Sequence, residues 1–518
     1  MTNTVENEAA YQGGDPMADR RRKLSRLRDE MSVDPYGHRT DDLIDLLAAT
    51  ALFQPDTPDE ARPSAAIAGR IVLHRDIGKL IFMTLRDHSG DLQVALSKKQ
   101  VDEVSFQIAK AADLGDIVVA RGLVGQTRTG EITLWVQGDA EKGPGFEMAC
   151  KSLAPPPEKW KGLQNPELRY RKRYVDMAAN PEVLRTFHAR SRIIKRIRDF
   201  LGDPPAPFGP PFLEVETPMM QPVAGGAAAR PFVTHHNALD MPLFMRVAPE
   251  LYLKRLLVGG MPRVFEINRN FRNEGIDHSH NPEFTMLELY QSFGDYRSMM
   301  ELTEHLLHTL AMEIGGAEAL PFRGETISYA LPFRRATYHA LFAEHNGFPA
   351  DDDERLRHHA EELGIEVQGR DHDVVLSEVW DRTVEHHLQS PTFVTDYPAS
   401  LCPLTKTSPD DPSLAERFEL FVSGMELANA YTELNDPDAQ ETNFRAQVAG
   451  LDDEEATFRT VDDDFLEALR VGMPPAGGLG IGIDRVVMLM TNASSIRDVI
   501  LFPLMRAEST APQTDDGT

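Results

Sequence analysis

The chain has 518 residues, with 81 acidic and 54 basic side chains, a net charge of −27 and 2 cysteines. This length is sufficient for two or more domains with large cores, whereas Cys150 and Cys402 are too few and too far apart for a disulfide framework or a thiolate metal cluster. Because no apolar run of about 18 residues and no secretory signal are present, we expect a cytoplasmic protein without membrane spans. The acidic excess argues against generic nucleic-acid binding, but it leaves room for one specific RNA on a local basic surface.

The first part of the chain predicts a polar extension followed by a β-barrel. Residues 1–62 are polar, and the basic helical segment 20–28 is either a solvated helix face or a contact for a polyanion. Residues 63–153 contain five β-rich runs, with a hairpin turn between the second and third and a helical piece between the third and fourth. This pattern fits an OB-fold barrel, which typically grips single-stranded nucleic acid with aromatics and cations. Phe82 and Arg70 are candidates for that face, although Phe82 is equally well explained as a core residue.

A linker and one large α+β unit follow the barrel. The linker, 154–173, is rich in proline and ends in a basic cluster, and residues 174–508 form the α+β unit. In this unit we expect a helix over 183–201, a strand over 212–218 that is stopped by proline, and a helix over 249–258. The stretch 320–397 alternates helical and extended patterns and indicates no role, and residues 509–518 are expected to be a disordered tail.

Residues 263–290 give the strongest indication of a functional site. Read with a period of two, they form two antiparallel strands joined by a loop of about ten residues. The polar face of this pair carries Glu266, Asn268, Asn270 and Arg272 on the first strand, and Phe284, Met286, Glu288 and Tyr290 on the second. With Glu274, His280 and Glu283 close by in sequence, there are too many ionisable groups on one side for core packing to be the explanation.

A second pair of strands, around a turn at 423–424, brings carboxylates together. In a two-residue hairpin, Glu419 and Glu426 share a face. Paired carboxylates repel unless a cation lies between them, and hard oxygen ligands suit Mg²⁺ bound to a substrate's phosphates. Asn429 and Glu433 fall on the opposite parity, so a bulge or a strand end must re-aim them if they serve the same site. Each acid by itself is also consistent with an exposed strand residue.

A third stretch, 477–490, has glycine at every second position from 478 to 482. One face of this strand therefore lacks side chains, so a planar ring can lie against the backbone. We expect Asp484 to cap the helix that follows, and Arg485 in its first turn to pair with phosphate or cover the ring. Glycine-rich sequence alone is weak evidence, because this one is neither a P-loop nor a dinucleotide-binding fingerprint.

Together these stretches resemble the class II aminoacyl-tRNA synthetases, with 212–218 as motif 1, 263–290 as motif 2 and 478–485 as motif 3. The segments 225–241, 248–255 and 429–436 resemble class II lysyl-tRNA synthetases specifically. The resemblance extends in the family's order from about residue 20 to 506. It implies an α+β protein in which an OB-fold anticodon-binding barrel precedes a catalytic domain built on an antiparallel β-sheet with flanking helices.

The resemblance also implies roles for individual residues. The positions that hold ATP in the family are Arg272, Glu274, His280, Asn281, Phe284, Glu419 and Arg485. Those that hold lysine are Gly226, Glu250, Glu288, Tyr290, Asn429 and Glu433, and those that hold Mg²⁺ are Glu419 and Glu426. The catalytic residues would be Arg272 and Arg485, which neutralise charge while the substrate carboxylate itself attacks the α-phosphorus. Selection of lysine would rest on buried anions and acceptors around its ammonium.

The family's partners are expected as well. Arg70, Phe82 and Gln93 would contact the anticodon of tRNA(Lys), and motif 1 would form a homodimer interface. Two segments depart from the family's pattern, because 203–210 contains more proline and 136–146 is longer and richer in glycine.

Three functions are consistent with the sequence. The leading hypothesis is ATP-dependent attachment of lysine to tRNA(Lys) through a lysyl-adenylate. Relatives that pass a lysine-like group to a protein generally lack the amino-terminal barrel that this sequence predicts. A catalytically inactive RNA-binding protein with a synthetase fold would have damaged motifs, whereas Arg272, Glu274, Glu419, Glu426 and Arg485 are all present.

Overall fold

The computed structural model describes residues 15–138, 143–157, 163–227, 229–448 and 461–506. The chain divides into two compact units, Met1–Leu184 and Arg185–Thr518, and each is described by itself. The expected tail 509–518 and the first 14 residues of the expected extension lie outside the described residues.

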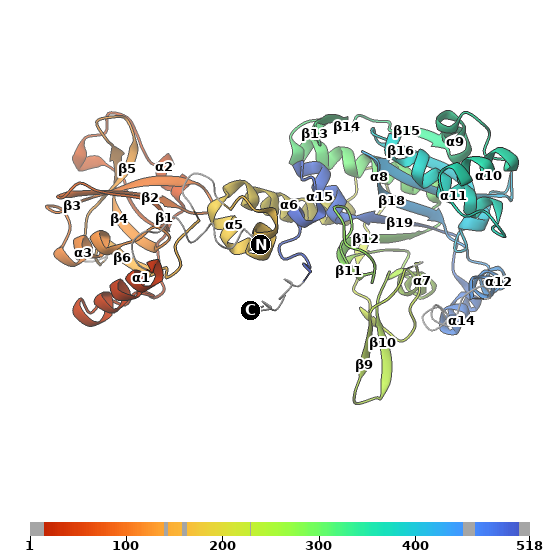
Figure 1. The fold of residues 1–518 in the computed structure, drawn as a ribbon, viewed down its shortest axis with the longest axis horizontal. Coiled ribbons are helices and arrows are strands. Elements are labelled where there is room, and N and C mark those ends of the chain that lie inside the picture. The colour runs from red at the N-terminus through yellow and green to blue at the C-terminus, as the bar shows by residue number, and fades with distance from the viewer. Residues whose placement is uncertain (1–14, 139–142, 158–162, 228, 449–460, 507–518) are drawn as a thin grey trace, which may run out of the picture. The chain divides into compact units, whose positions relative to one another are not determined.

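The first unit is a closed barrel, as the sequence predicts. Its six-stranded sheet has the order β1-β2-β3-β5-β4-β6, and pairing of β1 with β4 closes it. The strands are β1 Ser64–Asp76, β2 Leu80–Arg86, β3 Asp91–Ser97, β4 Ile117–Gln126, β5 Ile132–Val136 and β6 Phe146–Cys150. Helix α3, Glu103–Ala111, lies between β3 and β4 in sequence (Figure 1). The sequence predicts five strands in 63–153, and β6 is a sixth that was not predicted, because a five-residue strand after a glycine-rich stretch gives almost no periodic signal.

The basic segment near the start of the chain is partly structural. It forms α1, Pro16–Ser25, which continues into a π-helical turn at Arg26–Glu30. Arg20 is buried and donates hydrogen bonds to the carbonyls of Leu114 and Ser152. Lys23 Nζ lies 2.6 Å from Asp113 Oδ1. These cations therefore attach the helix to the barrel. Helix α2, Leu46–Ala51, follows before β1.

The second unit is built on an eight-stranded sheet with the order β15-β16-β17-β18-β19-β12-β11-β7. Its strands are β7 Leu213–Glu214, β11 Arg263–Phe271, β12 Glu283–Ser292, β15 Arg334–Thr337, β16 Thr392–Pro398, β17 Leu414–Val422, β18 Met425–Thr432 and β19 Ala476–Gly482. The pairs β7–β11 and β15–β16 are parallel, and the others are antiparallel. This confirms the predicted antiparallel catalytic sheet, although motif 1 contributes only the two residues of β7 where the sequence predicted a strand over 212–218. The chain after β7 is not part of the strand, and there the Thr217 hydroxyl donates a hydrogen bond to Glu266 at 2.7 Å.

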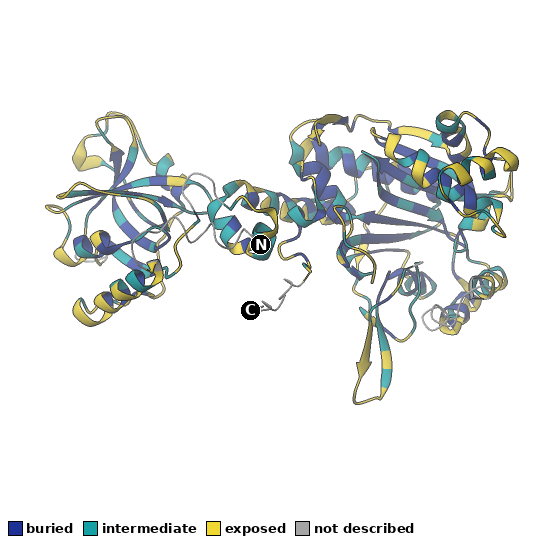
Figure 2. Cartoon of the chain, in the orientation of Figure 1, coloured by how far each residue is buried: buried dark blue, intermediate teal, exposed yellow. Residues whose placement is uncertain are grey.

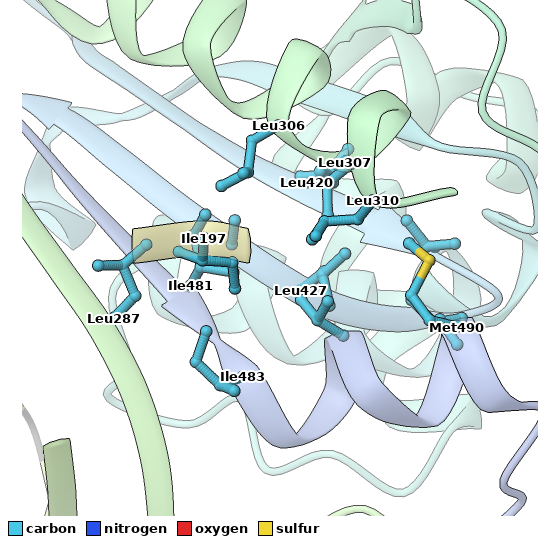
Figure 3. Close-up of a cluster of buried hydrophobic side chains, with 14 of the residues drawn as sticks. Ile197, Leu287, Leu306, Leu307, Leu310, Leu420, Leu427, Ile481, Ile483 and Met490 are labelled. Carbon is cyan, nitrogen blue, oxygen red and sulfur yellow. The ribbon is translucent and has the colours of Figure 1, made fainter. Parts of the chain in front are cut away.

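Three helices cover one face of this sheet. They are α6 Pro181–Gly202, α8 Tyr296–Leu310 and α15 Ile483–Thr491. Their apolar side chains join those of the strands in one core, which fixes the opposite face of the sheet as the polar one. Figure 3 shows Leu306, Leu307 and Leu310 of α8 near Leu420 and Leu427 of the strands.

Further helices complete the second unit. They are α7 Glu250–Val258, α9 Tyr338–Asn346, α10 Asp353–Glu362, α11 His372–Thr383, α12 Pro437–Val448, α14 Asp463–Gly472 and α16 Ile496–Val499, whereas α4 Pro166–Arg171 and α5 Arg173–Ala179 belong to the first unit. The segment 320–397 thus contributes three helices with an apolar core of their own, in which Tyr338 stacks on Trp380 at 4.0 Å. Two small sheets complete the unit, β8 Met220–Gln221 with β9 Val233–His236 and β10 Met241–Met245, and β13 Ala319–Phe322 with β14 Glu325–Ser328. In Figure 2 the central strands are buried, whereas β9 is exposed.

Candidate active site

The polar face of the sheet begins with the hairpin β11–β12. Its register pairs Glu266 with Glu288 and Asn270 with Phe284, so both strands present their polar positions to the same side. This is the arrangement that a period of two predicts from the sequence. The opposite positions, such as Phe265 and Leu287, lie in the apolar core.

Strand β19 runs between β12 and β18 and forms the floor of the site. Gly480 pairs with Glu288 on one side and with Asn429 on the other, and Gly478 pairs with Tyr290. A Cβ atom on Gly480 would lie 2.5 Å from Met286 Cε and 3.1 Å from Asn429 Oδ1. The bare face expected from the sequence is therefore the face toward the polar side chains, and it has no room for a side chain.

A β-bulge in the hairpin of β17 and β18 determines which of its side chains share a face. Phe421 pairs with Glu426, but Glu419 pairs with Asn429, because the register shifts in between. The extra residue lets Glu426 and Asn429 share a face although three positions separate them, and the Asn429 side-chain amide donates to Glu426 Oε1 at 2.9 Å. Of the two alternatives that the sequence left open, a bulge or a strand end, the structure has the bulge, at Leu427, whose side chain joins the apolar core.

A cavity of about 170 Å³ lies over the bare strand. Of the residues expected to hold ATP, the ones that line it are Arg272, Glu274, His280, Asn281, Phe284 and Arg485. Arg272 lies over the ring of Phe284, with its guanidinium carbon 5.2 Å from the ring centre, and its buried Nε has no hydrogen-bond partner among the described residues. Glu426 also lines the cavity, and Arg485 donates to its backbone carbonyl. A buried unpaired guanidinium N–H favours an anionic ligand in this cavity.

Neighbouring residues orient the cavity walls. His280 lies 3.2 Å from Arg485 through Nε2 and 2.8 Å from Asp277 through Nδ1. Although burial acts in the opposite direction, hydrogen bonds from Ser279 and His280 hold the pKa of Asp277 well below its usual range, so Asp277 is an ionised support for His280. Sequence reasoning missed Asp277, and its position three residues before His280 in the motif 2 loop was the available signal.

Asp484 has a different role from the expected helix cap. Gly482 is the cap of α15, and Asp484 lies inside the helix. Its carboxylate accepts from the backbone N–H of Thr285 at 2.7 Å and from Arg190 at 2.5 Å. The prediction was wrong because Asp484 binds the backbone N–H of Thr285 in the neighbouring strand β12. The sequence of the glycine-rich segment does not reveal that neighbour. Asp484 thereby connects α6, β12 and α15 at the wall of the cavity.

A second cavity, of about 390 Å³, adjoins the first. Of the residues expected to hold lysine, the ones that line it are Gly226, Glu250, Glu288, Tyr290 and Asn429. Tyr431, which sequence reasoning missed although it shares the parity of Asn429, lines it too. The residues common to both cavities are Arg272, Met286, Asn429 and Gly480. The two cavities therefore adjoin at these four residues, of which Arg272 is the only cation.

The second cavity has an anionic wall. Burial, reinforced by the neighbouring Glu250, raises the pKa of Glu288 to about 8. The Tyr290 hydroxyl donates to Glu288 at 3.3 Å. Near neutral pH the Glu288 carboxyl thus holds a proton that an incoming cation can displace.

Glu433 is close to this wall but does not line the cavity. It is 1% exposed, and its carboxylate contacts the ammonium of Lys254, which also lies 2.6 Å from Glu250 Oε1. The Glu433 oxygens make no aligned hydrogen bond among the described residues, so the contact is an ion pair rather than a well-directed hydrogen bond. Sequence reasoning missed Lys254, although its spacing of four residues from Glu250 on a helix brings the two side chains together.

Glu419 lies beside the two cavities and lines neither. Its carboxylate contacts the Arg417 guanidinium and accepts from the Tyr397 hydroxyl at 2.8 Å. Burial raises the pKa of Glu419, Arg417 opposes the rise, and the proximity of Glu426 adds to it. Two carboxylates that repel each other across the polar face fit a hard divalent cation held jointly with substrate phosphates. No group of three or more ligating side chains able to hold a metal alone occurs in the described part of the chain.

The barrel has a cavity of its own, of about 820 Å³. Phe82 and Gln93 line it, with Trp135 packed edge-on 6.4 Å from Phe82. Arg70 does not line it and instead donates to the Gly115 carbonyl at 2.7 Å. The cations that line it are Arg62, Arg75 and Arg128, and Arg75 lies 5.6 Å from the centre of the Phe82 ring. Arg75 is paired with Phe82 across β1 and β2. The register of these two strands would therefore have identified Arg75 as the arginine beside the Phe82 ring.

Comparison with known proteins agrees with this architecture. Residues 165–506 match the model for tRNA synthetases class II (D, K and N), and residues 65–138 match the OB-fold nucleic acid binding domain. A lysine–tRNA ligase of Pelotomaculum thermopropionicum is 48% identical over 95% of this chain and 94% of its own length. A lysine–tRNA ligase of Carboxydothermus hydrogenoformans is 47% identical over 93% and 96%, and one of Cronobacter sakazakii is 44% identical over 96% and 98%. Within the described residues, no helix is both long and apolar enough to cross a membrane. Identity of this extent, together with both matched domains, places the chain in the lysine–tRNA ligase family of the class II tRNA synthetases.

Proposed function

We propose that the protein activates L-lysine with ATP to lysyl-adenylate, releasing pyrophosphate, and transfers the lysyl group to the 3′ end of tRNA(Lys). The observation that carries the proposal is the meeting of two cavities at Arg272. One cavity offers cations and an aromatic ring, as a nucleotide requires, and the other offers buried carboxylates, as an ammonium requires. Activation joins a carboxylate to an α-phosphorus, so its two substrates must meet beside a cation.

The reaction needs no protein nucleophile. The lysine carboxylate attacks the α-phosphorus, the bond to the β-phosphate oxygen breaks, and pyrophosphate leaves. Arg272 would contact both the carboxylate and the α-phosphate, and its unpaired buried Nε supports such a contact. Adenine would stack between Phe284 and Arg485 over the glycine strand, with His280 beside the phosphates. Catalysis then consists of holding two anions in line and neutralising the charge that develops between them.

The side chain of lysine would extend along β12 into the anionic cavity. Its ammonium would meet Glu250 and Glu288, with Tyr290 and Asn429 as hydrogen-bonding neighbours. An aspartate or asparagine side chain would place a negative or neutral group against these carboxylates, which disfavours both. Gly226 lies at the cavity wall with a φ of 90°, a conformation that favours glycine.

Mg²⁺ would be held by Glu419 and Glu426 together with the phosphates of ATP. The fit rests on the donor set, since two hard carboxylates without a third protein ligand match the way Mg²⁺ is shared between protein and nucleotide. When bound, the ion would offset phosphate charge. Arg417, which now pairs with Glu419, would keep that carboxylate ionised and oriented.

The barrel would bind the anticodon of the tRNA. Phe82 and Trp135 offer rings for bases to stack on, and Gln93 and Arg75 offer hydrogen bonds and charge. We also propose a homodimer in the cytoplasm, where tRNA charging serves protein synthesis. The dimer is supported by exposed apolar side chains at motif 1 and the strand after it, with Leu213 54% and Met220 55% exposed. Sedimentation at micromolar concentration that gave only monomer would contradict it.

The decisive experiment is amino-acid-dependent exchange between ATP and pyrophosphate, in Mg²⁺ buffer, with lysine, β-lysine, aspartate and asparagine compared. Exchange with lysine alone, followed by charging of tRNA(Lys), is the expected result. Exchange with another amino acid alone would overturn the pocket assignment, and no exchange at all would favour an inactive RNA-binding protein. Transfer of lysine to a protein in place of tRNA would support the remaining alternative, which the presence of the matched OB-fold domain disfavours.

A further inference from the structure

A short chain of hydrogen bonds lies beside the cavity of the barrel and ends at Gln93. Its members are the Glu131 carbonyl, the Thr133 hydroxyl and the Gln93 side-chain amide. Thr133 Oγ1 lies 3.1 Å from the Glu131 carbonyl oxygen and 2.8 Å from Gln93 Nε2. Strand β5 runs parallel to β3 with Thr133 opposite Gln93, so the register of the strands brings these two side chains together. Thr133 is fully buried, whereas Gln93 lines the cavity.

The direction of these hydrogen bonds is fixed at Glu131. A backbone carbonyl can only accept a hydrogen bond, so the single hydroxyl proton of Thr133 is donated to it. The same carbonyl accepts the backbone N–H of Thr127 at 2.9 Å, which holds it in place at the turn between β4 and β5. The Thr133 oxygen can then only accept, and Gln93 has to present its NH2 group. The reverse orientation of the amide would lose one of the two hydrogen bonds.

The Gln93 amide therefore offers the cavity a defined set of polar atoms. In the described part of the chain its only side-chain hydrogen bond is the one to Thr133, so the carbonyl oxygen is free for a ligand. One amide hydrogen remains beside that oxygen. The group thus presents a donor and an acceptor in a fixed order.

The aromatic rings of the cavity lie next to this amide. Ala95 follows Gln93 by two residues on β3 and pairs with Phe82 on one side and with Trp135 on the other. Two residues along a strand span roughly 7 Å on the same face. A base that stacks on these rings can therefore turn its hydrogen-bonding edge toward Gln93.

We propose that Thr133 is a positioning residue that locks the Gln93 amide in one orientation, so that the barrel accepts uracil at this place and rejects cytosine. On the edge formed by N3 and the group at C4, uracil presents a donor followed by an acceptor, which matches the fixed amide. Cytosine presents the reverse order and matches only an amide that has turned over. The anticodon that pairs with the lysine codons contains uracil. This inference rests on the proposed function, because it assumes that the cavity of the barrel binds the anticodon.

The test compares Thr133→Val with the wild type, because valine keeps the shape of the side chain and leaves the amide free to turn. The kcat/KM of aminoacylation is measured with tRNA(Lys) and with transcripts in which one anticodon uridine at a time is replaced by cytidine. Gln93→Met identifies the uridine concerned, since the preference for uridine should be lost there. At that position Thr133→Val should lower the ratio of uridine over cytidine charging by roughly 5- to 150-fold, chiefly because the cytidine transcript is charged faster.

Faster charging of the wrong tRNA separates a positioning role from a structural one, because damage to the barrel would slow the charging of both transcripts. Thr133→Ser keeps a hydroxyl and should retain the wild-type ratio. Thr84→Val is the matched control, since Thr84 pairs with Gln93 from the other neighbouring strand, β2, and shares no side-chain hydrogen bond with it. Lysine-dependent ATP–pyrophosphate exchange should stay unchanged in every variant. If Thr133→Val does not fold, Thr133→Ala removes the same hydroxyl and should give the same shift.

Four results would overturn the inference. Thr133→Val could keep the wild-type ratio, or lower it only because the uridine transcript is charged more slowly. Its effect could persist in a Gln93→Met background, in which case Thr133 acts through another group. Gln93→Met could leave the ratio unchanged at every uridine. A wild type that does not charge tRNA(Lys) would refute the proposed function first, whereas charging together with any of the four results would refute the role of Thr133 alone.

Discussion

Replacement of Glu288 by glutamine tests the anionic pocket most directly. The variant keeps the size of the side chain and its hydrogen bonds but cannot become anionic. Breaking a buried ion pair by removing one partner costs about 3–5 kcal/mol. Part of this is offset, because Glu288 has a pKa of about 8 and must first lose its proton at pH 7, which costs about 1.4 kcal/mol. The net loss of roughly 1.6–3.6 kcal/mol corresponds to a lysine KM raised ~15- to 400-fold.

Lysine-dependent ATP–pyrophosphate exchange measures this effect, with the KM values for lysine and ATP determined separately. The ATP KM should change less than about threefold, because Glu288 lines the lysine cavity and not the nucleotide cavity. Glu283→Gln, an exposed position on the same strand, is the control and should leave both values unchanged. A lysine KM that stayed at the wild-type value in Glu288→Gln would remove this residue from the pocket, and equal rises in both KM values would point to a general disturbance of β12.

Three further outcomes follow from the same geometry. Because ionised Glu288 is the form that attracts an ammonium, the lysine KM of the wild type should fall by up to about tenfold per pH unit as the pH rises toward its pKa of about 8 and then level off; a flat profile from pH 6.5 to 9 would contradict this. Phe82→Ala should raise the KM for tRNA roughly 5- to 150-fold, the loss expected for about 1–3 kcal/mol of base stacking, and leave ATP–pyrophosphate exchange intact; an unchanged tRNA KM in aminoacylation assays would exclude Phe82 from the contact. Gly478→Ala should lower lysine exchange at least about tenfold, because the new methyl group would lie 2.6 Å from Tyr290 Cε1 and overlap Glu433; Gly202→Ala, where a Cβ meets nothing within 4 Å, is the control, and normal exchange by Gly478→Ala would show that the strand can shift.

Elements with strong local patterns could be predicted from the sequence. The polar hairpin β11–β12, the glycine strand β19 and the five main barrel strands all follow from alternation with a period of two, which the chain carries locally. Short or irregular elements could not, as β6 and the two-residue β7 show. Their existence depends on pairing with distant strands rather than on their own residues.

The features of the candidate site likewise fall into those that the sequence predicted and those that only the tertiary structure decided. Residue types and spacing in the sequence determined the polar face, the bare strand and the need for a bulge or a strand end that re-aims Asn429 toward the face of Glu426, because each is a property of a single strand or hairpin. Only the tertiary structure decided which groups meet across elements. The bridging of Glu250 and Glu433 by Lys254, the carboxylate of Asp484 on the Thr285 N–H, and Arg75 in place of Arg70 on the barrel face all join side chains whose proximity arises from packing. A charge pairs with whatever the fold places beside it, and the sequence alone does not specify that neighbour.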